Sequence, residues 1–404
     1  MNTIPLGPVD YVFTGVGSQP VSFAFYYPSS LDPDKLKQSL GGALGHFPIL
    51  QSRLQKTSET DYAYRLTEDG LTFDTVECDS PFNKTDRFEK YIVPVLSVEG
   101  NPLVKISLTK TPNGSVLAAS ISHALVDGFS YFHFLTSWAR LCRGERILAP
   151  CGDRNTHLAS LNPGSKKVTA DDLYDKCGLF LGDSRRPIDG GRTQPRRFFI
   201  PEETVRSYRM EAKRTHDVPF TENDVLTAHL WRTYLPQWTA PTSGPKAYVT
   251  CPFDFRRAMS GIPRNYFGCA LCFATASFDA EGLERAPLGD LAHAVRNAVR
   301  RYNNDAVTGA LNTLNDFRRQ NGPDAFEKIH LRHPDRGTII TNLTRMPIRD
   351  MDFGAGAPAD FLAHVDVTNG MALLPADRGV EAMVFHPHGV APEAAAPMRH
   401  DSKG

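Results

Sequence analysis

The chain has 404 residues, of which 41% are hydrophobic and 22% charged, an ordinary globular composition that allows two domains with substantial cores. Its 45 basic and 45 acidic residues leave no net charge to attract a nucleic acid or an anionic membrane surface, so neither is expected as a partner. The segment Met1–Pro5 lacks the pattern of a signal peptide, and no apolar run approaches the roughly 18 residues that span a bilayer. We therefore expect a cytoplasmic protein.

The first 150 residues alternate predicted strands with predicted helices and form a first lobe. A turn signal at Pro112–Gly114 joins two apolar strands into a hairpin, and Gly144 ends the helical pattern that follows. The clearest elements are a helix over 34–45, strands over 103–109 and 115–121, and a helix over 129–142.

Residues 151–195 form a long polar stretch, which we interpret as a connection between lobes with one short helix near Ala170–Cys177. Residues 196–390 form a second lobe, and residues 391–404 are expected to be a disordered tail. In the second lobe the patterns predict strands over 197–200, 247–252 and 336–342, helices over 201–213 and 222–234, and two helices within 288–316.

The cysteines and histidines give no metal site. Seven cysteines are an odd and scattered number, which favours free thiols over a disulfide framework. Cys269 and Cys272 resemble half of a zinc site, but positions i and i+3 of a strand face opposite sides and cannot share a metal. The pair in His386–His388 lacks a third ligand. We predict no metal ion and no permanently bound cofactor.

The most informative stretch is Ser-His-Ala-Leu-Val-Asp-Gly at 122–128, where His123 follows a predicted strand and Asp127 precedes a predicted helix. A neutral imidazole near its ordinary pKa can take a proton from an attacking group and return it to a leaving group. No serine or cysteine nucleophile motif accompanies it, which favours direct transfer between two bound substrates. The spacing alone also fits an ordinary loop histidine.

Several distant segments together resemble one family, the BAHD acyltransferases. His123–Gly128 resembles the family signature His-x-x-x-Asp-Gly, and Asp352–Gly356 resembles Asp-Phe-Gly-Trp-Gly with Ala355 in place of the tryptophan. Further similar segments follow the order of the family at 6–10, 25–27, 47–50, 226–231, 254–257 and 265–268, although Cys269 stands where an asparagine is usual. The resemblance implies two similar α/β lobes, each a mixed β-sheet flanked by helices, with a channel between them as in chloramphenicol acetyltransferase.

The resemblance also implies roles for the residues of both signatures. His123 would be the general base, while Asp127 would turn away from the channel and pair with Arg256 to hold the loop. Physical chemistry agrees, because a buried carboxylate without a partner is costly. The residues with an implied structural role are Asp127, Gly128, Arg256, Asp352, Phe353, Gly354 and Gly356.

Other positions resemble parts of the family that handle the substrates. Thr341 is the candidate donor to the oxyanion, although an ordinary strand threonine bonded to backbone is an equal alternative. The family often has a tryptophan two residues later, where this chain has Leu343. Lys213 and Arg214, before Thr221, are candidate contacts for the phosphates of coenzyme A, with a solvated helix end as the alternative.

The function expected from these observations is transfer of an acyl group from acyl-CoA, a co-substrate, to a hydroxyl of a specialised metabolite, with an amine as the second choice of acceptor. We expect a monomer. One alternative is a condensation-type enzyme that uses a carrier-protein thioester, but such enzymes have a doubled histidine where this chain has Ser122. The other is a non-catalytic binding protein, which the departures at Leu343, Cys269 and Ala355 keep open.

Overall fold

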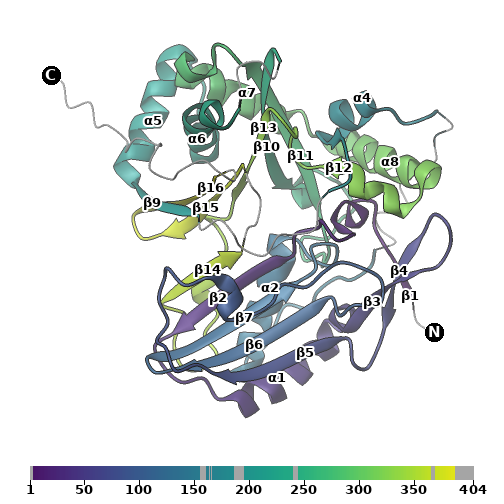
Figure 1. Ribbon diagram of the computed structural model, residues 1–404, viewed down its shortest axis with the longest axis vertical. Coiled ribbons are helices and arrows are strands. Elements are labelled where there is room, and N and C mark those ends of the chain that lie inside the picture. The colour runs from purple at the N-terminus through teal and green to yellow at the C-terminus, as the bar shows by residue number, and fades with distance from the viewer. Residues whose placement is uncertain are drawn as a thin grey trace.

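The computed structural model describes residues 3–154, 161–162, 164, 166–185, 195–239, 244–364 and 369–386. Within this part of the chain two lobes are each built on one large mixed sheet (Figure 1), which is the fold class that the sequence predicts. No helix of the described residues has both the length and the apolar character needed to cross a membrane.

The first lobe contains a five-stranded sheet with the order β14-β2-β7-β6-β5. β5 and β6 are parallel, and all other neighbours are antiparallel. Helices α1 and α2 pack against each other, and their buried side chains join those of the sheet in one core. The bounds are β2 (Val21–Tyr27), β5 (Leu71–Glu77), β6 (Val104–Thr111), β7 (Gly114–Ile121), β14 (Asp360–His364), α1 (Pro33–His46) and α2 (Gly128–Cys142).

The second lobe contains a six-stranded sheet with the order β11-β10-β13-β15-β16-β9, in which β10, β13 and β15 are parallel. Three helices pack on it and on one another. The bounds are β9 (Arg196–Pro201), β10 (Lys246–Asp254), β11 (Leu271–Asp279), β13 (Gly337–Asn342), β15 (Gly370–Ala376), β16 (Gly379–Phe385), α5 (Glu202–Thr215), α6 (Glu222–Trp238) and α7 (Leu288–Arg300).

Smaller elements lie around the junction of the lobes. They form a three-stranded sheet β1-β4-β3, a two-stranded sheet β12-β8, and helix α8, which packs on η4. The bounds are β1 (Thr3–Pro5), β3 (Ser52–Lys56), β4 (Tyr62–Leu66), β8 (Phe180–Leu181), β12 (Ile329–His330), α4 (Ala170–Asp172), α8 (Asn304–Asn321), and the short helical turns η1 (Asp10–Phe13), η2 (Pro48–Gln51), η3 (Phe88–Lys90), η4 (Leu173–Cys177), η5 (Phe255–Arg257), η6 (Leu283–Arg285), η7 (Pro323–Lys328) and η8 (Ile348–Asp350).

The predicted helices and strands are all present, with ends within a few residues, but the division into lobes needs one correction. β14 lies inside the expected second lobe, yet it pairs with β2 at the edge of the first sheet. The chain therefore crosses back between the lobes after residue 356, and residues 196–390 do not form one lobe alone. The expected tail at 391–404 lies outside the described residues.

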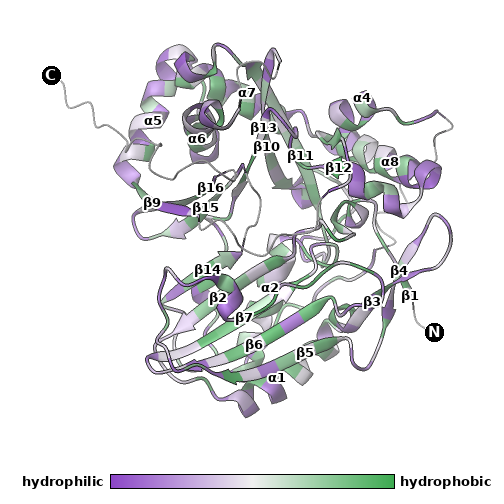
Figure 2. Ribbon diagram, in the orientation of Figure 1, coloured by the Kyte–Doolittle hydropathy of each residue, from purple (hydrophilic) through white to green (hydrophobic). Residues whose placement is uncertain are grey.

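One continuous hydrophobic core extends through both lobes. It includes Phe13 and Leu125 from the first lobe together with Phe273, Ile340 and Met371 from the second. Hydrophobic residues predominate along the inner strands of the two sheets in Figure 2, whereas β9, at one edge of the second sheet, and α5 carry many hydrophilic residues. Because the two lobes bury apolar surface against each other in this core, the core stabilises their relative position around the loop that follows β7.

Candidate active site

The loop that carries His123 runs from the end of β7 to the start of α2. β7 is the central strand of the first sheet and forms the predicted antiparallel hairpin with β6. Ser122 fixes the beginning of the loop, because its N–H donates to the Leu103 carbonyl at 2.8 Å and its own carbonyl accepts two N–H groups from the residues that follow. Rigid elements on both sides therefore determine the direction of His123.

The imidazole of His123 is partly buried and lies flat against the ring of Phe13, with ring centroids 3.9 Å apart and planes 6° from parallel. Within the described chain, no hydrogen-bond partner meets its Nδ1 atom. Burial lowers the pKa of His123 below its usual 6.5, and the carbonyls of His123 and Val126 and the charge of Asp127 only partly oppose this effect. The ring is therefore neutral at pH 7, the form that a general base requires.

Both oxygens of the Asp127 carboxylate accept hydrogen bonds from groups of the protein. Its carboxylate caps α2 by accepting the N–H of Ser130 at 2.8 Å, accepts the N–H of Ala270 at 2.9 Å, and pairs with both arms of Arg256 at 2.7 and 3.1 Å. The two charged side chains are only 1% and 2% exposed. Burial alone would raise the pKa of Asp127, but Arg256 and the hydrogen bonds lower it below its usual value. The pair expected from the sequence is present, and it leaves Asp127 unsuited to accept a substrate proton.

Arg256 fastens the second sheet to the first turn of α2. It stands in η5, directly after β10, and donates to the carbonyls of Tyr266 and Gly268 at 3.1 and 3.0 Å and to the Ser130 hydroxyl at 3.0 Å. Its guanidinium also lies over the Phe129 ring, 4.6 Å from the centroid. All of these contacts surround the end of the loop that begins with His123.

Thr341 lies in β13, which ends beside the start of α2. A Cβ atom placed on Gly128 would come within 3.3 Å of the Met346 Cε and 3.6 Å of the Leu343 Cδ2, so the second lobe closely approaches this point. No described residue hydrogen-bonds to the Thr341 hydroxyl, and no hydrogen bond joins Thr341 to His123. The role of Thr341 as donor to the oxyanion stays a prediction.

Asp352–Gly356 is a tight bend. The Asp352 Oδ1 accepts the N–H groups of Gly354 and Gly356 at 2.7 and 2.9 Å. Both glycines have positive φ, +96° and +92°, a conformation that a Cβ atom disfavours. The aspartate and the two glycines of this signature are thus explained by the backbone.

The same bend lies at the far end of α2 from His123. Phe353 packs edge-on against Trp138, with centroids 4.8 Å apart, and its carbonyl accepts the Cys142 thiol at 3.4 Å. The Tyr27 hydroxyl donates to the Met351 carbonyl at 2.9 Å. Because α2 has 15 residues, the bend is about 20 Å from Asp127 along the helix. It lies away from the histidine, as expected.

Replacing Gly354 with alanine should lower the free energy of unfolding by about 1–2 kcal/mol, because an L-residue at this φ is strained. Urea unfolding would measure it, with the turnover rate changing less than twofold. Gly41→Ala in α1 is the matched control: nothing lies within 4 Å of its new Cβ, so stability should rise by about 0.5–1 kcal/mol. Equal effects at the two sites would contradict the assignment of strain to the bend.

The candidate coenzyme A contacts lie together on the second lobe, apart from His123. Lys213 and Arg214 are exposed in the last turn of α5. Thr221 caps α6 by accepting the N–H of Asp224, which also pairs with Arg296 at 3.0 Å. Thr221 therefore has a structural role of its own, while the two basic residues face solvent at the C-terminal end of a helix, where cations are favoured.

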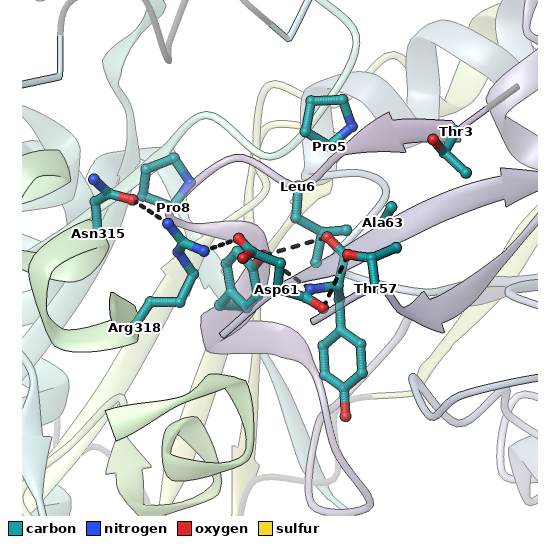
Figure 3. A pocket seen from close by; sticks show the side chains of 11 residues that line it. Thr3, Pro5, Leu6, Pro8, Thr57, Asp61, Ala63, Asn315 and Arg318 are labelled. Carbon is teal, nitrogen blue, oxygen red and sulfur yellow. Dashed lines mark hydrogen bonds and ion pairs between the residues drawn. The ribbon is translucent and has the colours of Figure 1, made fainter. Parts of the chain in front are cut away.

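His123 lines neither of two cavities in the described part of the chain. One has a volume of about 350 Å³ and is lined by residues of the N-terminal segment, β4 and α8, including Tyr11, Asp61 and Arg318 (Figure 3). The other, of about 490 Å³, lies beside Tyr174 and His333. In the part of the chain that is described, no group of three metal-binding side chains occurs, and all seven cysteines are free thiols.

Sequence reasoning missed two residues of the site, Phe13 and Arg154. Arg154 pairs with Asp10 across 144 residues, and its other arm donates to the carbonyl of Leu125 at 3.1 Å. Asp10 belongs to the opening segment at 6–10, but no local pattern links it to an arginine in the polar connection. The stacking of Phe13 on His123 likewise exists only in three dimensions.

Comparison with known proteins agrees with this geometry. The model of the transferase family matches residues 1–389. The hydroxycinnamoyl-CoA:5-hydroxyanthranilate N-hydroxycinnamoyltransferase of Avena sativa is 27% identical over 81% of this chain and 76% of the relative. The shikimate O-hydroxycinnamoyltransferase of Nicotiana tabacum is 24% identical over 82% of this chain and 78% of the relative.

Among solved structures, TRI101 of F. graminearum in complex with coenzyme A and deoxynivalenol has a TM-score of 0.75 and 14% identity, with 95% of each chain covered. At this identity the likeness establishes the fold alone. The two-lobed architecture with its mixed sheets is thus also the fold of TRI101.

Proposed function

Because the chain belongs to the BAHD transferase family, whose model spans residues 1–389, we propose that it transfers the acyl group of an acyl-CoA to a hydroxyl of a specialised metabolite, with His123 as general base. Acyl transfer with acyl-CoA as co-substrate is the activity of this family. The finer points, which are the choice of a hydroxyl and the role of each residue, are the proposal.

The observation that carries the proposal is the contrast between His123 and Asp127. The two are the titratable groups of the loop, and Arg256 with two N–H groups occupies the carboxylate. The imidazole is partly exposed, neutral and without a hydrogen bond at Nδ1 to the described residues. Only His123 is thus available on this loop to move a proton.

The proposed reaction is a direct transfer. His123 takes the proton of the acceptor hydroxyl as the oxygen attacks the thioester carbonyl, which forms the new C–O bond and a tetrahedral oxyanion. The C–S bond then breaks, the oxyanion returns to a carbonyl, and the thiolate receives the proton from the imidazolium. The histidine ends as it began, neutral, and no covalent enzyme intermediate is formed.

Thr341 is the proposed donor to the oxyanion. It lies one residue before the end of β13, and Leu343, just after this strand, comes within 3.6 Å of a Cβ atom placed on Gly128 in the first turn of α2. A preorganised donor of this kind is typically worth about 3–4 kcal/mol of barrier. Leu343 adds apolar surface but no donor at the position where the family often has tryptophan, so the threonine would act without that neighbour.

A hydroxyl acceptor is favoured by the need for a base. An alcohol must lose its proton as it attacks, whereas an amine attacks as the neutral base and loses its proton later. An imidazole whose pKa is lowered by burial remains able to accept a proton across the neutral range. The relatives named above include one N-acyltransferase and one O-acyltransferase, so the acceptor atom must be tested directly.

Charge reversal at the end of α5 should weaken acyl-CoA binding. In Lys213→Glu and in Arg214→Glu, KM for acyl-CoA should rise about 2- to 5-fold at low salt, as expected for loss of one surface ion pair, with kcat unchanged. The rise in KM over the wild-type value should become smaller at high ionic strength, because salt screens exposed charges. Arg206→Glu, exposed earlier on the same helix, is the control and should leave KM unchanged. Equal KM values in all three variants would refute the assignment.

The test of the function is release of free thiol from hydroxycinnamoyl-, benzoyl- and acetyl-CoA with shikimate, anthranilate or 5-hydroxyanthranilate as acceptor. The last compound carries a hydroxyl and an amine on one ring, so identification of its product as ester or amide decides the acceptor atom. The expected result is acceptor-dependent thiol release and an ester. An amide would replace the hydroxyl by an amine in the proposal. Binding of acyl-CoA without thiol release under any condition would indicate a carrier-protein donor or a binding role.

A further inference from the structure

The turn η1 contacts the ring of His123 through Phe13. Phe13, the last residue of η1, is 3% exposed and covers one face of the imidazole at 3.9 Å. Its ring also meets Phe273 of β11 at 6.2 Å. Phe13 is therefore held between the catalytic loop of one lobe and the sheet of the other.

The first residue of η1 is tied to the same loop through a buried ion pair. Asp10 accepts the N–H of Gly7 at 2.8 Å and pairs with Arg154, and each of the two charged side chains is 1% exposed. The Nη2 atom of Arg154 donates a hydrogen bond to the carbonyl of Leu125 at 3.1 Å. A charged pair this deep is retained at a desolvation cost, which makes a specific positional role the natural explanation.

A tyrosine completes the arrangement. The Tyr64 hydroxyl donates to the carbonyl of Ala124 at 2.6 Å, and the guanidinium of Arg154 lies over the Tyr64 ring, 4.9 Å from its centroid. The carbonyls of Ala124 and Leu125, the two residues after His123, thus both accept hydrogen bonds from buried side chains, those of Tyr64 and Arg154. Neither carbonyl can turn without breaking a buried hydrogen bond.

We propose that η1 is a positioning element for His123, in which Phe13 fixes the plane of the imidazole and the Asp10–Arg154 pair, with Tyr64, fixes the backbone that carries it. The proposal rests on the role of His123 as general base. In this proposal Arg154, in the connection between the lobes, is a positioning residue that does not contact the substrate. A histidine ring otherwise rotates about two side-chain bonds, and a misplacement of about 1 Å costs roughly 10²-fold in rate.

The first experiment replaces Phe13 with leucine, which keeps apolar bulk but removes the flat surface. We expect kcat to fall roughly 10-fold with KM for acyl-CoA unchanged. The pKa of His123, followed by NMR of histidine-labelled protein, should rise toward its usual value because one face becomes accessible, and the acid limb of the pH–rate profile should move to higher pH with it. Asp127 is the charged group that acts on the ring among the described residues, and the variant leaves it in place.

Phe23→Leu is the matched control. Phe23 is also 3% exposed and packed among aromatic rings in the first lobe, including Tyr131 and Phe132, but it does not stack on His123. It should lose stability with no shift in the pKa of His123 and no loss of kcat beyond twofold. If Phe13→Leu behaves as Phe23→Leu does, the positioning role of Phe13 is refuted.

The second experiment replaces Arg154 with lysine. One ammonium group keeps the charge beside Asp10 but cannot also reach the Leu125 carbonyl in the forked geometry of a guanidinium. We expect a folded protein with kcat reduced several-fold and KM unchanged. Arg197→Lys is the control, because Arg197 likewise bridges Glu381, at 2.5 Å, and a backbone carbonyl, that of Phe361 at 3.5 Å. Equal kinetics in the two variants would refute the role of Arg154.

Failure of this proposal is distinguishable from failure of the proposed function. If His123→Ala keeps its activity, the general base lies elsewhere, whatever the pKa of His123 does in Phe13→Leu. If His123→Ala is inactive while Phe13→Leu keeps both the wild-type kcat and the wild-type pKa of His123, only the positioning role falls. The NMR signal that vanishes in His123→Ala identifies the histidine under observation.

Discussion

Arg256→Met is expected to lower the free energy of unfolding by about 3–5 kcal/mol, the range found when one partner of a buried ion pair is removed. The reason is that Asp127, 1% exposed, would keep its charge in the interior with only N–H groups for partners. Chemical denaturation monitored by circular dichroism and by fluorescence measures the change.

A control and a second variant make this prediction specific. Arg349→Met breaks an ion pair with Asp377 in which both side chains are more than two-thirds exposed, and it should cost less than about 1 kcal/mol. Asp127→Asn combined with Arg256→Met removes both charges and should recover part of the loss. Stability of Arg256→Met within 1 kcal/mol of wild type would show that the pair does not hold the loop.

The same pair makes stability depend on acid pH. Arg256 holds the pKa of folded Asp127 below the usual 3.8, so the folded state binds this proton more weakly than the unfolded state does. The stabilisation is therefore complete above about pH 5 and is lost as the pH falls through 3.8 to the lower pKa of the folded state. In Arg256→Met, burial without the guanidinium raises the pKa of Asp127. The difference in the free energy of unfolding between the wild type and this variant should therefore become smaller toward acid pH.

Local pattern predicted the elements because each has its cause in neighbouring residues. The helix after His123 starts where Asp127 can cap it, and the bend at Asp352–Gly356 has glycines where φ is positive. The pairing of Asp127 with Arg256 came from the family resemblance, and the fold supplies its physical reason by bringing η5 against the first turn of α2. These parts of the site were within reach of the sequence.

The remaining parts depend on packing between distant segments. β14 joins the first sheet although it follows the second lobe in sequence, and only the pairing with β2 reveals this. The stacking of Phe13 on His123 and the ion pair of Arg154 with Asp10 join residues more than 100 positions apart. No periodic pattern in the sequence predicts either contact. Sequence reasoning therefore found the proposed base but not the residues that contact it and its loop.

The largest effect on activity is expected from His123→Ala. Loss of the base should lower kcat about 10²- to 10⁴-fold, while KM for acyl-CoA changes little because the side chain is assigned to proton transfer and not to binding. The fold should persist, since the imidazole Nδ1 takes no hydrogen bond from the described residues. His333→Ala is the matched control: that histidine also stacks face to face on an aromatic ring, Tyr248 at 5.0 Å, and burial also lowers its pKa.

The pH dependence ties the effect to the imidazole itself. With the pKa of His123 lowered by burial, the neutral base persists below pH 6.5, so kcat/KM of the wild type should stay flat through neutrality and fall only at more acid pH. In His123→Ala this limb should vanish, because the group that titrates is gone, whereas His333→Ala should retain it. A His123→Ala protein that stays within fivefold of wild type, or that keeps the same acid limb, would assign the proton transfer to another residue and leave the stacked ring of His123 with a packing role alone.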